Sequence, residues 1–177
     1  FDITTLVQTN NRLRIIGNLP YNISTPILFK LFHHLEHIED MTFLLQQEVV
    51  ARMTATPNQK QYGRLSVMTQ YFCQAVEQLA VPASAFTPAP QVESNLVKLI
   101  PHRPQPAIAN NMSQFSHIVR DAFNHRRKTV SNSLKDWLDA STLSSLEINP
   151  KQRPQELSVR DYVNISNFIQ KNKDELH

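Results

Sequence analysis

Short apolar segments alternate with segments of helical periodicity over the first hundred residues. Residues 13–17 and 41–45 are apolar runs of strand length, and we expect the first to be a buried strand. The stretch between them predicts a helix that begins with a hydroxyl cap at Ser24 or Thr25 and carries Pro26 in its first turn. Its apolar residues recur at helical spacing, namely Ile27, Leu28, Leu31, Phe32 and Leu35. The order strand, helix, strand predicts an α/β fold with parallel neighbouring strands.

The same alternation continues to residue 100. Residues 46–48 follow at the carboxyl end of the second strand, and residues 49–53, VVARM, predict a helix after it. Residues 65–72 predict another helix. Residues 76–81 and 96–100 are apolar runs that predict two further strands. Because one long loop joins these two strands, we expect them to pair as an antiparallel hairpin.

The chain changes character at residues 101–111. This segment, PHRPQPAIANN, contains three prolines and no periodicity, which is typical of a linker. We therefore predict one domain over residues 1–100 and a second over residues 112–177. The second domain should be small and all-helical, with a helix-rich stretch at 115–138 and a last helix at 159–169 capped by Ser158.

Composition excludes several classes of protein. No apolar run approaches the roughly 20 residues that a membrane span requires, so we expect a soluble globular protein without a membrane partner. Cys73 is the only cysteine, which predicts a reducing cytoplasm and argues against a disulfide framework. The nearby histidines at positions 33, 34 and 37 lack cysteine partners, and we predict no metal site.

Residues 18–21, Asn-Leu-Pro-Tyr, directly follow the first predicted strand. Open α/β sheets bind substrates at the carboxyl ends of their strands, so we expect these residues to line a site. The Asn18 amide oxygen and the carbonyl of Leu19 or Pro20 can accept from an exocyclic amine, while the Tyr21 ring can stack on the base that carries it. This arrangement suits methyl transfer to N6 of adenine. The alternative is a strand-end turn in which Asn18 only caps backbone groups.

A second candidate lies in the loop between the last two predicted strands. Phe86 stands in AFTPAPQVES, where Pro88 and Pro90 would hold its ring without a helix or strand. Extracting an adenine from its stack costs a few kcal/mol, and an aromatic sandwich of Tyr21 and Phe86 would offset about 1 to 3 kcal/mol per face. A lone phenylalanine is otherwise more often part of a core.

Positive charge is concentrated in the second half of the chain. Residues 1–97 hold six Lys and Arg against seven Asp and Glu, whereas residues 98–177 hold twelve against eight. If residues 119–137 formed one helix, an apolar stripe would lie on one side and a basic face on another. We expect the basic face to follow an RNA phosphate backbone, a solvated charged face being the alternative. Its candidate RNA-binding residues are Arg120, Asn124, Arg127, Lys128 and Lys135.

Arg126 does not fit such a single helix, because it would fall inside the apolar stripe. The sequence therefore predicts either a helix break near His125 or a partner for Arg126 inside the fold.

Only two glycines, Gly17 and Gly63, occur in the chain. The sequence therefore contains no glycine-rich loop that could bind a nucleotide or the methionine of S-adenosylmethionine. The chain also starts at Phe1, in what we interpret as the approach to a strand. We interpret it as the C-terminal part of a longer enzyme, and expect residues 1–177 alone to be inactive and to bind the cofactor poorly.

These motifs carry a resemblance to a known family. Residues 18–21, NLPY, are similar to the fourth motif of the amino-methyltransferases that use S-adenosylmethionine. The longer string of residues 18–26, NLPYNISTP, resembles the small-subunit rRNA adenine dimethyltransferases of the KsgA family. The FxPxPxVxS pattern from Phe86 to Ser94 resembles the eighth motif of these enzymes. QQEVVARM, YGRLSV and AFNHRRKT, which end at residues 53, 67 and 129, extend the resemblance over most of the chain.

The resemblance implies the C-terminal part of a Rossmann-like methyltransferase sheet followed by a small all-α, RNA-binding domain. It implies S-adenosylmethionine as cofactor, with Asn18 beside it and most of its site before Phe1. It implies a cytoplasmic monomer that methylates N6 of two adjacent adenosines near the 3′ end of small-subunit rRNA and binds the assembling ribosomal subunit.

Three other functions are weighed against this one. The large-subunit dimethyltransferases that confer macrolide resistance share both motifs, although NLPYNISTP and AFNHRRKT look more like the small-subunit enzymes. In DNA adenine methyltransferases a proline usually stands where this chain has Leu19. Outside enzymology, the chain could be an assembly factor that binds RNA without transferring a methyl group.

Overall fold

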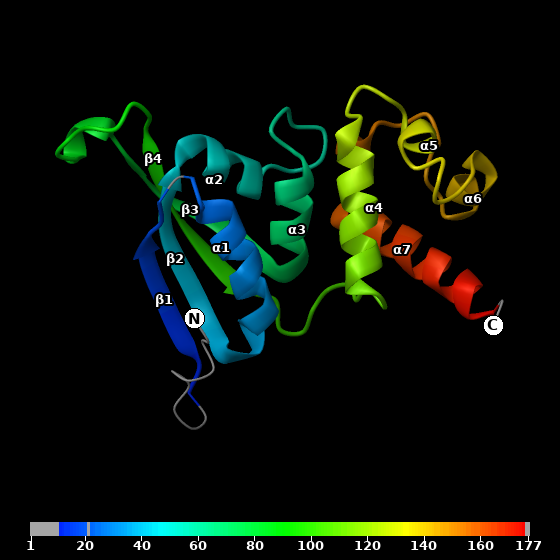
Figure 1. Cartoon of the computed structure of the whole chain (residues 1–177), viewed down its shortest axis with the longest axis horizontal. Helices are drawn as coiled ribbons and strands as arrows, with labels where there is room; N and C mark the ends of the chain where they lie inside the picture. The colour runs from blue at the N-terminus through cyan, green and yellow to red at the C-terminus, as the bar shows by residue number, and fades with distance from the viewer. Residues whose placement is uncertain (1–10, 21, 176–177) are drawn as a thin grey trace. The chain divides into compact units, whose positions relative to one another are not determined.

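The computed structural model describes residues 11–20 and 22–175 and divides into two compact units (Figure 1). The sheet unit comprises residues up to Thr54 together with Phe72–Pro104. The helical unit comprises Ala55–Tyr71 and the residues from Gln105 onward. Residues 55–71 thus belong to the helical unit by their contacts, although they lie within the first domain that we predicted from the sequence. The predicted division into domains over residues 1–100 and 112–177 stays a prediction.

The sheet unit is built on one mixed sheet of four strands in the order β1-β2-β4-β3. These are β1 (Leu13–Asn18), β2 (Ile38–Gln46), β3 (Cys73–Val81) and β4 (Ser94–Pro101). β1 and β2 are parallel, as the strand–helix–strand pattern predicts. β3 and β4 form the predicted antiparallel pair, and β4 also pairs antiparallel with β2. The α/β class predicted from the sequence is confirmed.

Helices connect the strands of this unit. They are α1 (Ser24–Leu31) with the following 3-10 segment η2 (Phe32–His37), α2 (Gln47–Thr54) and the short turn η3 (Ala83–Ala85). The predicted hydroxyl cap of α1 is wrong, because the helix already begins at Ser24 and Ile23 occupies the cap position without a side-chain cap bond. α2 begins immediately where β2 ends, and packs against β2, β3 and β4.

Alternate residues of β2 and β4 point into the core, where Met41, Phe43, Leu45, Val97 and Leu99 are at most 1% exposed. β1 differs from the buried strand that we predicted. Its residues alternate between half-buried and exposed, and Ile16 is 83% exposed. Among the described residues β1 pairs only with β2, and none of them covers the Ile16 side chain.

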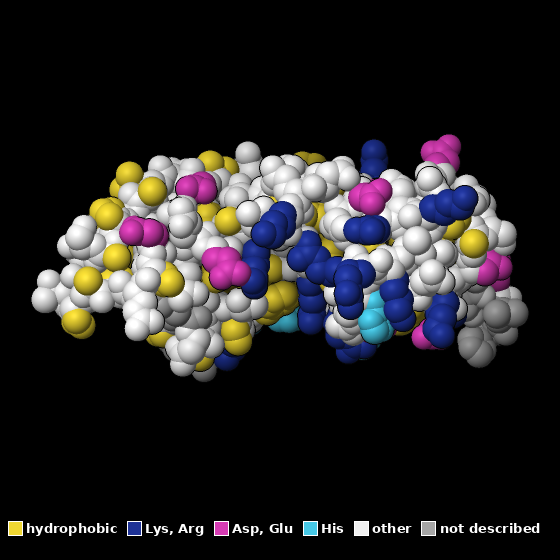
Figure 2. Space-filling model, turned by 90° about the horizontal axis from the view of Figure 1, so that it is seen from above, with side chains coloured by type: hydrophobic (Ala, Val, Ile, Leu, Met, Phe, Trp, Pro, Cys, Tyr) yellow, Lys and Arg dark blue, Asp and Glu magenta, His cyan; other side chains and the backbone are white. Residues whose placement is uncertain are grey.

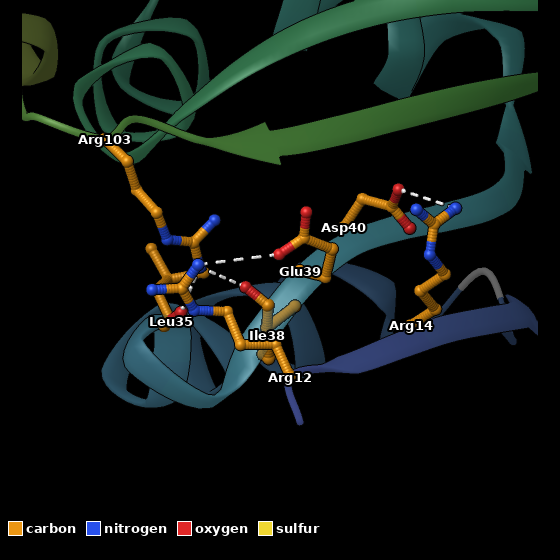
Figure 3. Close-up of polar contacts among 7 residues, drawn as sticks. All are labelled: Arg12, Arg14, Leu35, Ile38, Glu39, Asp40 and Arg103. Carbon is orange, nitrogen blue, oxygen red and sulfur yellow. Dashed lines mark hydrogen bonds and ion pairs between the residues drawn. The ribbon is translucent and has the colours of Figure 1, made fainter. Parts of the chain in front are cut away.

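Charged side chains are paired at the amino ends of the parallel strands (Figure 3). Asp40 of β2 is 8% exposed and lies 3.4 Å from Arg14 of β1 and 3.1 Å from Lys98 of β4. These pairs connect three of the four strands. Nearby, Glu39 lies 3.6 Å from Arg12, and Arg103 donates to the carbonyls of Leu35 and Ile38. We call Arg12, Arg14, Glu39, Asp40, Lys98 and Arg103 the charged end of the sheet.

The helical unit contains α4 (Met112–Asn124), α5 (Val130–Ser133), α6 (Ala140–Ser145), η4 (Pro154–Glu156), α7 (Val159–Asp174) and all but the last residue of α3 (Arg64–Phe72). As predicted, Ser158 caps the last helix, since its hydroxyl accepts from the amide of Asp161. The unit has its own core, whose largest buried side chains include Tyr62, Phe115, Ile118, Leu134 and Tyr162.

The proline-rich segment 101–111 has no helix or strand of its own after Pro101, as its composition predicts. Its residues from Gln105 onward are nevertheless anchored within the helical unit. Ala109 donates its amide to the Tyr71 hydroxyl, and Asn167 of α7 accepts from the amide of Asn110 and donates to the carbonyl of Ile108. Among the described residues, no helix is long and apolar enough to cross a membrane.

Candidate active site and nucleic-acid interface

The candidate residues from two distant parts of the sequence line one hollow in the sheet unit. Asn18, Leu19 and Pro20 form one side of it, and the 82–93 loop contributes Phe86, Pro88 and Pro90 to the other. The hollow has a volume of about 200 Å³. The structure therefore brings Phe86 to the tetrapeptide, as the aromatic sandwich requires. Tyr21, its predicted second member, lies outside the described residues.

Asn18 is placed by the strand pairing. It is the last residue of β1 and pairs with Leu44 of β2, so it stands at the carboxyl end of both parallel strands. Its side chain is exposed, and within the described residues the Asn18 amide has no hydrogen-bond partner. Within the described residues the amide caps no backbone group, so it is accessible to a ligand, and its role in a site stays a prediction.

The two backbone carbonyls proposed as acceptors are not equivalent. The carbonyl of Pro20 accepts from the amide of Ile23 at 3.1 Å, which fixes the turn before α1. The amide of Leu19 donates to the carbonyl of Leu44 at 3.4 Å, whereas no described residue donates to the Leu19 carbonyl. The carbonyl of Leu19 is therefore the better candidate acceptor beside Asn18.

Phe86 follows the turn η3, and its amide donates to the carbonyl of Ala83 at 3.2 Å. Its ring is half-buried, so one part of it remains accessible. The base of the loop is held by Glu93, a residue that the sequence did not single out. The Glu93 carboxylate accepts from the amide of Ala83, and its carbonyl accepts from the amide of Gln47. No local spacing predicts these contacts, because they join residues far apart in the chain.

The basic face predicted on a single helix is wrong in its geometry. α4 ends at Asn124, and His125 has the non-helical angles φ −130° and ψ 56°. A turn follows in which the amide of Lys128 donates to the carbonyl of His125, and α5 begins only at Val130. The helix break that the sequence left open therefore occurs. Helical spacing counted across residues 119–137 does not apply, so the five candidate residues do not share one helix face.

Arg126 also has a partner inside the fold, which is the second possibility that the sequence left open. Its guanidinium donates to the carbonyls of Lys60 and Tyr62, at 2.8 and 3.0 Å. These bonds connect the turn after α4 with the loop before α3 inside the helical unit. Arg126 is therefore used within the fold, while Arg127, Lys128 and Lys135 are exposed and have no ion-pair partner among the described residues.

Arg120 is engaged as well, since its Nε lies 3.0 Å from Asp121, which also accepts from the indole of Trp137. Partial burial raises the pKa of the Asp121 carboxyl, but the hydrogen bonds from Arg120 and Trp137 outweigh burial and lower it below its ordinary value. Despite these pairings, Lys and Arg side chains remain crowded on the part of the surface that Figure 2 shows over the helical unit.

Glu48 in the first turn of α2 forms an ion pair with Arg52 one turn later in the same helix. Among the described residues, no three side chains of His, Cys, Asp or Glu come together as a group that could hold a metal ion.

Comparison with known proteins agrees with the motifs. The family profile described as "Ribosomal RNA adenine dimethylase" matches residues 1–171. "Ribosomal RNA small subunit methyltransferase A" of Coxiella burnetii (strain Dugway 5J108-111) is 53% identical over 169 residues, which cover 96% of this chain and 65% of the relative. The protein of the same name from Vibrio vulnificus (strain YJ016) is 48% identical over 172 residues, covering 97% and 64%. The chain thus spans about 65% of the length of these relatives.

Solved structures agree with the fold. A dimethyladenosine transferase from Plasmodium falciparum superposes with a TM-score of 0.78 at 25% identity, covering 92% of this chain and 67% of that one. The 23S rRNA methyltransferase ErmE superposes with a TM-score of 0.68 over 96% of this chain and 70% of its own, and at 17% identity it shows the fold alone. The methyltransferase fold predicted from the sequence is confirmed, and the chain belongs to the ribosomal RNA adenine dimethylase family.

Proposed function

We propose that this chain is part of an rRNA adenine N6,N6-dimethyltransferase that modifies two adjacent adenosines near the 3′ end of small-subunit rRNA. The observation that carries the proposal is the hollow lined by Asn18, Leu19 and Phe86 at the carboxyl end of β1. The names of the relatives that are 48 to 53% identical support the small subunit as the source of the substrate.

The chemistry follows from the two acceptors. The N6 lone pair of adenine is delocalised into the ring, so the reaction needs groups that favour a tetrahedral nitrogen. The Asn18 amide oxygen and the Leu19 carbonyl accept from the two N–H bonds of the amine and thereby stabilise the transition state. When bound, S-adenosylmethionine supplies an electrophilic methyl group on a sulfonium, so no dedicated general base is required. Asn18 is the described residue that we place beside the cofactor.

The aromatic rings hold the target base outside the RNA stack. Phe86 is half-buried against the hollow and offers a ring to one face of the adenine. We assign the other face to Tyr21. The two contacts together offset the cost of removing the base from its stack.

We assign RNA binding to the helical unit. Arg127, Lys128 and Lys135 are exposed cations that we expect to contact phosphates, together with the exposed Arg120 and Asn124 of α4. Each lost phosphate contact should reduce the slope of log K against log salt by about 0.7 to 0.9.

This assignment is tested with subunit binding of the full-length protein at several salt concentrations. Arg127→Ala and Lys135→Ala should each weaken binding and reduce the salt slope. Lys171→Ala is the matched control, because Lys171 is also exposed but pairs with Glu175 at the end of α7. An unchanged slope in the Arg127→Ala, Lys135→Ala double variant contradicts the assignment.

Two alternative functions predict different outcomes of a methyl-transfer experiment. A large-subunit dimethyltransferase would methylate large-subunit rRNA, and the likeness to ErmE concerns the fold alone. An assembly factor would bind the small subunit and transfer nothing. We favour the small-subunit enzyme, which we place as a monomer in the cytoplasm, where the buried free thiol of Cys73 stays reduced.

The decisive experiment is methyl transfer by the full-length protein. Unmethylated small and large subunits are each incubated with labelled S-adenosylmethionine, and the rRNA is digested and analysed for dimethyladenosine. We expect label in two adjacent adenosines of the small-subunit rRNA. Label in large-subunit rRNA, or binding to small subunits without label, contradicts the proposal and supports the corresponding alternative.

A further inference from the structure

The 82–93 loop has to hold an aromatic ring without a helix or strand around it. The loop leaves the sheet after Val81 and returns at Ser94, and these two residues are the last pair of the β3–β4 ladder. Between them lie a single turn, η3, and mostly exposed residues. A loop of this kind samples many conformations unless specific contacts order it.

Glu93 supplies two such contacts at the base of the loop. Its carboxylate Oε2 accepts from the amide of Ala83 at 3.0 Å, across the two ends of the loop. Its carbonyl accepts from the amide of Gln47, the first residue of α2, also at 3.0 Å. The loop is thereby connected both to itself and to the carboxyl end of β2.

The hydrogen bond between Glu93 and Ala83 acts on Phe86 through the turn η3. Ala83 begins η3, and its carbonyl accepts from the amide of Phe86 at 3.2 Å. The Ala83 amide and the Ala83 carbonyl belong to neighbouring peptide groups joined at the Ala83 Cα, so the bond to the amide restrains the next peptide group, whose carbonyl accepts from Phe86. A charged acceptor makes the stronger hydrogen bond to a backbone amide.

We propose that Glu93 is a positioning residue for methyl transfer, which holds the 82–93 loop so that Phe86 lies over the hollow before the substrate base arrives. The inference rests on the proposed function, because it assigns Phe86 to the base. Preorganisation of this kind reduces the ordering cost that binding would otherwise carry. Glu93 itself does not touch the base, and acts only through Ala83 and Phe86.

The loop contact is tested first by hydrogen exchange in the full-length protein. Glu93→Ala should speed exchange of the Ala83 and Phe86 amides about fivefold or more, because the acceptor is lost. Glu93→Gln keeps an acceptor oxygen and should restore most of the protection. Gln91→Ala is the matched control, an exposed residue of the same loop, and should leave both amides unchanged. Unchanged exchange in Glu93→Ala overturns the proposal, whatever the protein methylates.

The link to catalysis is tested with a double-mutant cycle on methyl transfer to small subunits. Glu93→Ala should raise KM about threefold to tenfold, change kcat less, and be rescued by Glu93→Gln. In the Phe86→Ala background the same change should have no further effect, because its consequence passes through the ring. Additive effects in the cycle, or an unchanged KM in Glu93→Ala with faster exchange, overturn the positioning role.

The two measurements also separate this inference from the proposed function. A wild-type protein that transfers no methyl group contradicts the function, while the exchange data still decide whether Glu93 orders the loop.

Discussion

The two ends of the sheet unit use polar groups in opposite ways. At the charged end, Asp40 lies between Arg14 and Lys98, and every charge of that group contacts an opposite charge or a carbonyl. At the other end of β1, Asn18 is uncharged and has no partner within the part of the chain that the structure describes. Satisfied polar groups stabilise a fold, whereas an accessible unsatisfied group is available to a ligand. Together with the proposed function, this difference predicts that stability and chemistry are assigned to separate ends of the same strands.

The strongest test of this separation is Asn18→Ala in the full-length protein. Loss of one preorganised acceptor should lower the rate of methyl transfer about 100- to 1,000-fold. Thermal stability and subunit binding should change little, because the amide has no partner among residues 11–20 and 22–175 to lose. Asn11→Ala is the control, an exposed asparagine before the other end of β1, and should have normal activity. A destabilised but active Asn18→Ala protein would reverse the assignment.

Phe86→Ala should have the next largest effect. Losing one stacking face should cost about 1 to 3 kcal/mol of transition-state binding, measured as kcat/KM for small subunits. Phe86→Tyr keeps the ring and should retain most activity. If Phe86→Ala lowers the melting temperature while activity per folded molecule stays normal, the ring is part of the core and the site is incorrectly assigned.

Asp40→Asn should show the opposite behaviour. Removing the charge that faces Arg14 and Lys98 should lower the free energy of unfolding by about 1 to 2 kcal/mol, and less at high salt because Arg14 is largely exposed. Activity per folded molecule should stay normal. Denaturant titration at two salt concentrations measures this effect, with the more exposed Glu39→Gln as control. A loss of activity without a loss of stability would contradict the separation.

The smallest expected change concerns Cys73, which pairs with Pro101 at the charged end. Burial raises the pKa of its thiol to about 12, although the charge of Arg103 opposes this shift. The pKa of the Cys73 thiol in the folded state lies above the ordinary value of about 8.5. Burial of the neutral thiol therefore contributes fully to the stability of the folded state at pH 7. This contribution is lost as the pH rises from about 8.5 toward the folded pKa.

The thiol thus reports on local opening at the charged end. Asp40→Asn should speed its alkylation at pH 8 about threefold to tenfold, since more molecules open. Asn18→Ala should leave the alkylation rate unchanged. Equal acceleration by both variants would show that the two ends of the sheet open together.

The parts of the fold that could be predicted are those with a local signal. Apolar runs predicted the strands, and the helix between residues 13–17 and 41–45 predicted their parallel pairing. The hairpin of β3 and β4 followed from their single connecting loop. The insertion of β4 next to β2 had no such signal, because it depends on which strand edge is free after the others have paired.

Contacts between distant residues explain most of what the sequence did not predict. Arg103 reaches carbonyls 65 and 68 residues earlier, and Arg126 reaches Lys60 across 66 residues. The helix break at His125 was recognised as one of two possibilities only because Arg126 did not fit an apolar stripe. At the site, the motifs predicted Asn18 and Phe86, but not that the Pro20 carbonyl is already used by Ile23.

The pairing of Val81 with Ser94 makes the segment between them exchangeable. Since both ends belong to one antiparallel ladder, a replacement of different length can be grafted there without altering the order of the strands. The tetrapeptide at the end of β1 would be retained, while a new loop would present a different surface to the nucleotide that we propose as substrate. Substrate selectivity could therefore be redesigned in this protein through one contiguous stretch of twelve residues, 82–93, on an unchanged scaffold.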